Sequence, residues 1–270
     1  VFKYGGVQTS IYNALRSSQS SSPYYNKSTN AYCYIGTEKP NHDVVIVGWD
    51  DSYSKNNFNT DLEGDGAFIC QNSWGDNFGE NGFFYISYYD TNIGTHNVVY
   101  TDIENTDNYD HIYQSDLCGW VGQLGYNKDS IYGANVFTAE GNETLKAASF
   151  YATGKDSQYE LYVVRQFADE SSLEKMIPVA SGKLGNAGYY TVDFNQGIEV
   201  DAGERYAVVL HIITPGSVHP MAIEYAADEA TENVDLDDGE SYISVNGSKW
   251  VSVDTVEKSN LCIKAFSDNR

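Results

Sequence analysis

Short apolar runs bounded by Gly, Asp or Asn recur along this chain, and they constrain its fold more than any other feature. Three strong runs lie in the first hundred residues, at Val44–Trp49, Gly66–Asn72 and Gly82–Tyr89. About eight more follow at fairly regular spacing after residue 116. Runs of this length, separated by turn residues, are typical of β-strands, and few helix-period patterns compete with them.

The later runs alternate between apolar and polar positions. Tyr159, Leu161 and Val163, for example, alternate with polar partners. This alternation and the Gly/Asp/Asn turns predict an antiparallel sandwich or jelly roll. A polar stretch, Asp102–Asp116, precedes these runs. We therefore expect a first domain over residues 1–100, a linker over 101–110 and a β-sandwich domain over 111–270.

The charge is strongly acidic and unevenly distributed. The formal net charge is −22 over 270 residues. Residues 1–100 carry 10 acidic against 5 basic side chains, and residues 101–270 carry 28 against 11. Such a surface repels phosphate backbones and anionic lipids, which argues against nucleic acid or a membrane surface as a partner. No apolar run is long enough for a membrane span, and the first residues do not resemble a signal peptide.

Four cysteines, Cys33, Cys70, Cys118 and Cys262, are spread along the chain. Because no two are close in sequence, zinc-ribbon and redox spacings are excluded. An even count permits two disulfides, but nothing in the sequence specifies their pairing. Cys70 lies inside an apolar run, where a free thiol usually packs as a small hydrophobic residue.

His42 precedes the first apolar run, and Asn72 ends the second. A histidine can act as base and then as acid near neutral pH if a hydrogen-bond acceptor holds its ring in one tautomer. Antiparallel pairing of the two runs would bring the Asn72 oxygen to His42. Trp74 would then shield that hydrogen bond from water, and Gly75 and Gly79 suit the turns that follow. The alternative is a structural histidine with no catalytic role.

The stretches "NHDVVIVGW" and "CQNSWGDNFGENGFFYIS" resemble the C-terminal half of a papain-family cysteine peptidase. The resemblance implies an α+β fold, of which this region would hold mostly the β part. It also implies that His42 is the catalytic histidine, Asn72 the residue that orients it and Trp74 the shielding indole. No cofactor is required by such chemistry, and the partner would be a peptide or protein substrate.

The segment with the family's nucleophilic cysteine does not occur in the sequence, and neither Cys33 nor Cys70 suits that role. We therefore expect the N-terminal half of the peptidase domain to be supplied in cis or as a second chain. This chain alone should be inactive. A second departure is Asp43, where most relatives have alanine. Its carboxylate could point away from the site along the strand, or approach His42 closely enough to raise the histidine pKa.

The stretch from "NYDHIYQSDLCGW" to "NLCIKAF" resembles the lectin-like domain that follows the peptidase in clostridial cell-surface cysteine proteases. The resemblance implies a β-sandwich, an extracellular or cell-surface location and, in some members, bound calcium. Asn233–Tyr242 offers clustered carboxylates for such a cation, the alternative being a solvated acidic loop. Trp120 and Trp250 could stack on sugar rings in a glycan or cell-wall contact, or they could belong to the core.

Two functions therefore compete. The first is a papain-like cysteine endopeptidase, of which this chain carries the His/Asn half. The second is a catalytically inactive surface-adhesion or carbohydrate-binding protein in which the peptidase half is vestigial. The combination of His42, Asn72 and Trp74 favours the first, because two paired structural strands do not require these residue types.

Overall fold

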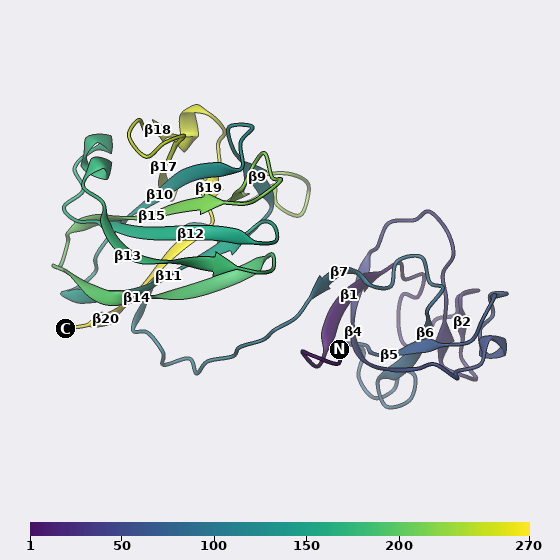
Figure 1. Ribbon diagram of the computed structural model, residues 1–270. Helices are drawn as coiled ribbons and strands as arrows, with labels where there is room; N and C mark the ends of the chain where they lie inside the picture. The colour runs from purple at the N-terminus through teal and green to yellow at the C-terminus, as the bar shows by residue number, and fades with distance from the viewer. The chain divides into compact units, whose positions relative to one another are not determined.

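The computed structural model describes residues 1–270, which divide into two compact units, Val1–Glu104 and Asn105–Arg270 (Figure 1). The division falls inside the segment 101–110, which the sequence suggested as a linker. Both units consist of strands and short 3-10 turns, without any α-helix. No helix in the chain has the length and apolar character needed to cross a membrane.

The first unit is built on one seven-stranded sheet with the order β2-β3-β6-β5-β4-β1-β7. All neighbouring strands are antiparallel except β3 and β6, which run parallel. The three predicted strands are confirmed at its centre as β4, β5 and β6. The strand bounds are β1 Val7–Ile11, β2 Tyr25–Asn26, β3 Ala31–Tyr32, β4 His42–Asp50, β5 Ala67–Gln71, β6 Phe83–Ser87 and β7 Thr95–Val98.

Alternate side chains of the central strands build the core of the first unit. Val44 and Ile46 of β4 are buried with Phe84 and Ile86 of β6, whereas Val47 is exposed. A β-bulge between Ile46 and Gly48 interrupts the pairing of β4 with β5. Because alternate residues of a strand face opposite sides, this burial pattern fixes the register of β4.

The second unit is an all-β sandwich, as the sequence predicted. A six-stranded sheet has the order β13-β12-β15-β10-β17-β18, a four-stranded sheet the order β14-β11-β20-β8, and a three-stranded sheet the order β19-β16-β9. The strand bounds are β8 His111–Tyr113, β9 Gly122–Leu124, β10 Ser130–Thr138, β11 Glu143–Ala152, β12 Ser157–Val164, β13 Ile177–Leu184, β14 Gly188–Val200, β15 Arg205–Ile213, β16 Met221–Glu224, β17 Glu240–Ser244, β18 Val251–Ser252, β19 Asn260–Leu261 and β20 Ile263–Asn269.

One apolar core joins the larger sheets of this sandwich. Leu161 of β12 and Leu210 of β15 pack in the same buried cluster as Phe150 of β11 and Ile263 of β20. On β12 the buried Leu161 lies between the exposed Glu160 and the half-buried Tyr162, as expected for a strand with one face in the core. Both Val163 and Val164 are buried, and Val164 packs in a second cluster on the other face.

Candidate functional site

Pairing of β4 with β5 brings His42 and Asn72 together. Val45 lies opposite Gln71, so extending this register by one residue places Asn72 opposite Val44. His42 is then diagonal to Asn72 on the same face of the sheet. His42 Nε2 lies 3.0 Å from Asn72 Oδ1, which is a normal hydrogen-bond distance. The proximity expected from the sequence is therefore observed.

The orientation of the Asn72 amide follows from its other contact. The backbone N–H of Ser73 donates to Asn72 Oδ1 at 2.8 Å, so the atom facing both groups must be the oxygen. His42 then donates its Nε2 hydrogen to that oxygen. In a neutral imidazole this leaves Nδ1 as the acceptor, and Nδ1 makes no hydrogen bond within residues 1–270. The ring is thereby held in one tautomer with Nδ1 available for a proton.

Trp74 lies beside this hydrogen bond. Its ring centroid is 5.3 Å from that of His42 at an interplanar angle of 37°, and its edge packs on Phe78. Gly79 has φ +58°, and a Cβ there would lie 2.0 Å from the Phe83 carbonyl oxygen. Only glycine therefore permits the turn that returns the chain from Trp74 to β6.

Neither cysteine of the first unit is placed to act as a nucleophile. Cys33 and Cys70 are fully buried, and no disulfide joins any of the four cysteines. Burial, with a smaller contribution from the negative charge of Asp90, raises the pKa of the Cys33 thiol to about 12. The same two causes raise the pKa of Cys70 still further. Since the thiolate is the reactive form, both thiols are inert at neutral pH.

Asp43 lies beside His42, and its side chain is held by the neighbouring strand. Ser10 Oγ donates to Asp43 Oδ1 at 2.7 Å and Gln8 Nε2 donates to Oδ2 at 3.2 Å. Of the two alternatives raised by the sequence, the carboxylate therefore turns toward β1. It nevertheless borders a cavity of about 380 Å³ that His42 also lines.

In the second unit, polar contacts hold the acidic loop at residues 233–242 in place. Asp237 pairs with Lys258 at 2.7 Å, and Asp238 accepts a hydrogen bond from Asn260. The Asn260 amide nitrogen also contacts Glu224 Oε1 and the carbonyl oxygens of Ser115 and Asp235. Glu224, Asn260 and Ser115 were not predicted, because they come from segments far from this loop in sequence.

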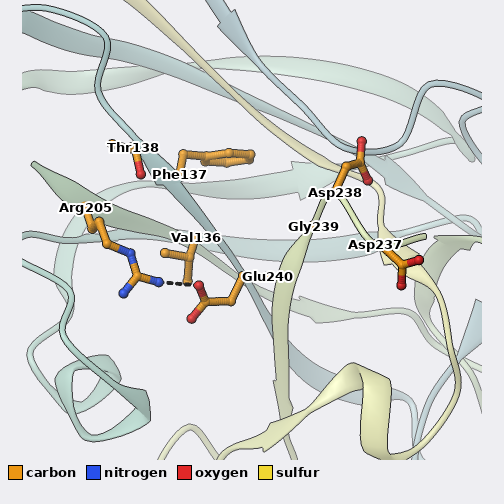
Figure 2. A pocket seen from close by; sticks show the side chains of 8 residues that line it. All are labelled: Val136, Phe137, Thr138, Arg205, Asp237, Asp238, Gly239 and Glu240. Atoms are coloured by element: carbon orange, nitrogen blue, oxygen red, sulfur yellow. Dashed lines mark hydrogen bonds and ion pairs between the residues drawn. The ribbon is translucent and has the colours of Figure 1, made fainter. Parts of the chain in front are cut away.

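An open cavity of about 460 Å³ lies at one end of the same loop (Figure 2). Arg205 of β15 and Glu240 of β17 form an ion pair across it. Neither predicted tryptophan lines this cavity. Trp250 is half-buried and packs against the apolar cluster that contains Phe167. The Trp120 ring lies beside Tyr151, with 5.8 Å between the two ring centroids.

Comparison with known proteins agrees with this description. Residues 5–103 match the model of the papain family cysteine proteases, and residues 112–267 match the lectin-like domain family. The chain thus belongs to the lectin-like domain family over residues 112–267, and its residues 5–103 are similar to the papain family cysteine proteases. Among curated proteins, no match is found.

Two solved structures of one clostridial protein, Cwp84, are similar over the whole chain. The first, Cwp84 after propeptide cleavage, is 29% identical with a TM-score of 0.83. The second comprises the cysteine protease and lectin-like domains of Cwp84, described as a surface layer associated protein of Clostridium difficile. It is 26% identical with a TM-score of 0.79. This chain covers 66% and 60% of those two chains, which is less than two thirds of either.

Proposed function

We propose that this chain supplies the acid–base half of a cysteine endopeptidase. The observation that carries the proposal is the His42–Asn72 hydrogen bond, with the Ser73 N–H fixing the direction of the Asn72 oxygen. A histidine held in a single tautomer, with one nitrogen free, suits repeated proton transfer at one position. The partner is a peptide or protein substrate, and no cofactor takes part.

In the proposed mechanism the nucleophile is a cysteine of the upstream half of the domain, in cis or on a second chain. His42 Nδ1 takes the thiol proton, and the resulting thiolate attacks the peptide carbonyl. His42 then gives that proton to the leaving amine, and the acyl-enzyme forms. A water molecule, deprotonated by His42, releases the acid product and restores the thiol. Asn72 accepts the Nε2 hydrogen throughout and stabilises the imidazolium.

A labelling experiment tests the division of the site between two segments. The 270-residue chain alone is expected to hydrolyse no peptide and to take no label from an active-site-directed epoxide at pH 6–7. Adding the upstream segment should restore both activities, because it supplies the thiolate. Peptide turnover by the isolated chain, with label on Cys33 or Cys70, would contradict the proposal.

A location outside the cell or on its surface is part of the same proposal. It is supported by the similarity to Cwp84, which is described as surface-layer associated. The acidic second unit, with 28 acidic side chains after residue 100, suits contact with neutral or basic wall components more than with anionic lipid. In this setting the lectin-like unit would hold the protease near its substrate.

We further propose that the lectin-like unit binds calcium at the oxygens around Asn260. Two carboxylates, of Glu224 and Asp238, and the carbonyls of Ser115 and Asp235 surround its amide nitrogen at 2.9–3.3 Å. The Asn260 NH₂ group has only two hydrogens for these four acceptor oxygens, so the acceptors outnumber the hydrogens. Oxygen ligands of this kind suit a hard cation. Because no group of three or more Asp, Glu, His or Cys side chains could hold a metal ion, the carbonyl oxygens of Ser115 and Asp235 would supply part of the ligand set.

Calcium titration tests this site. We expect millimolar calcium to raise the Tm of the second unit, because a ligand that binds only the folded state stabilises it. The paired change Glu224→Gln and Asp238→Asn should remove the calcium-dependent increase. Asp237→Asn is the matched control, since Asp237 lies in the same loop but pairs with Lys258. A Tm that does not respond to calcium in the unaltered protein would exclude the site.

A further inference from the structure

The cavity beside His42 contains a negative charge that the proposed mechanism does not use. Six residues line it: Ser10, Pro40, Asn41, His42, Asp43 and His96. Asp43 is the acidic member of this set, and none of the ion pairs in the chain includes it. A fixed carboxylate without a cationic partner therefore faces a cavity that also reaches the acid–base histidine.

The Asp43 carboxylate is positioned by neutral groups only. It accepts hydrogen bonds from Ser10 Oγ at 2.7 Å and Gln8 Nε2 at 3.2 Å. The Gln8 amide is itself oriented by Tyr100, whose hydroxyl donates to Gln8 Oε1 at 3.2 Å. These donors fix the direction of the carboxylate but leave its charge uncompensated. Two oxygens offer about four acceptor positions, so two donors leave capacity for a third group.

The position of His42 limits what can enter the cavity during hydrolysis. The imidazole must come within hydrogen-bond reach of the leaving amine, so the scissile bond lies against this end of β4. Asp43 follows His42 directly on that strand. Although neighbouring residues of a strand face opposite sides, both His42 and Asp43 line this cavity at the end of β4. A substrate side chain near the scissile bond that enters the cavity can therefore reach the Asp43 carboxylate, and Pro40 lines the same cavity.

We propose that Asp43 makes this cavity a subsite for a lysine or arginine side chain next to the scissile bond. The proposal rests on the proposed peptidase function and adds its substrate class. A cationic head group would form a charge-assisted hydrogen bond with the carboxylate, whereas a glutamate would be repelled.

The test uses the protease with its upstream segment and a series of fluorogenic peptides that differ at one position near the scissile bond. At that position the peptides carry lysine, arginine, norleucine or glutamate. We expect kcat/KM for lysine and arginine to exceed that for norleucine by about tenfold or more, with glutamate lowest. Asp43→Asn keeps the side-chain shape and should bring the lysine-to-norleucine ratio close to one. Asp43→Lys should invert the preference between lysine and glutamate.

Titration with an irreversible epoxide separates the possible failures. If the enzyme takes label and cleaves norleucine peptides but shows no cationic preference at any position near the cleavage site, the subsite is disproved and the peptidase function stands. A lysine-to-norleucine ratio that Asp43→Asn leaves unchanged also disproves the assignment. If the complete protein neither takes label nor cleaves any peptide, the peptidase function itself fails, and the subsite falls with it.

Discussion

Replacing His42 by alanine is expected to lower kcat for peptide hydrolysis by the complete protease at least about 1,000-fold. The imidazole is the group that moves the proton both from the thiol and to the leaving amine, so its loss affects acylation and deacylation. Steady-state hydrolysis of a peptide substrate measures the effect. His219→Ala, which removes a histidine from the second unit, should leave kcat unchanged.

The Asn72→Ala variant separates the orientation of the His42 ring by Asn72 from proton transfer by His42 itself. Without the Oδ1 acceptor the His42 ring can adopt either tautomer, although Trp74 still packs beside it. We expect a clear loss in kcat that is smaller than the loss for His42→Ala, together with a changed pH profile. Equal activity of Asn72→Ala and the unaltered enzyme would show that the hydrogen bond has no catalytic role.

The second large effect concerns stability. Glu143→Ala should destabilise the lectin-like unit by roughly 3 kcal/mol or more, because buried donors would lose a charged acceptor. Glu143 is fully buried and accepts hydrogen bonds from the Tyr113 hydroxyl at 2.8 Å, the Ser267 hydroxyl at 2.6 Å and the Gly141 N–H at 2.7 Å. Chemical denaturation measures the change, and Glu140→Ala, at an exposed neighbouring position, should alter stability little.

This stabilisation should depend on pH. Burial opposes ionisation of Glu143, but the hydrogen bonds from Ser267, Tyr113 and Gly141 outweigh it and lower the pKa of the carboxyl. A pKa that is lower in the folded state contributes stability above the ordinary glutamate value, and that contribution is lost as the pH falls through the folded value. The difference in unfolding free energy between the unaltered chain and Glu143→Gln should therefore shrink below about pH 4. A difference that grows on acidification would contradict this assignment.

The sequence predicts best those parts of the molecule whose structure is determined by short local patterns of residues. The strands β4, β5 and β6 follow from short apolar runs between turn residues, and the His42–Asn72 pair follows from pairing two of those strands. The oxygens around Asn260 could not be predicted in this way. They depend on where Ser115 and Glu224 lie after the sandwich has folded, and no local pattern encodes contacts between segments so far apart. The bulge at Ile46–Gly48 was also absent from the prediction, because the run Val44–Trp49 reads as continuous.

The Ser73 N–H that fixes the Asn72 oxygen belongs to the residue that directly follows Asn72. The histidine tautomer is therefore set once β4 pairs with β5 and Asn72 Oδ1 accepts the His42 Nε2 hydrogen. The imidazole then needs little reorganisation to receive a thiol proton, so its conformational entropy is lost on folding and not during catalysis.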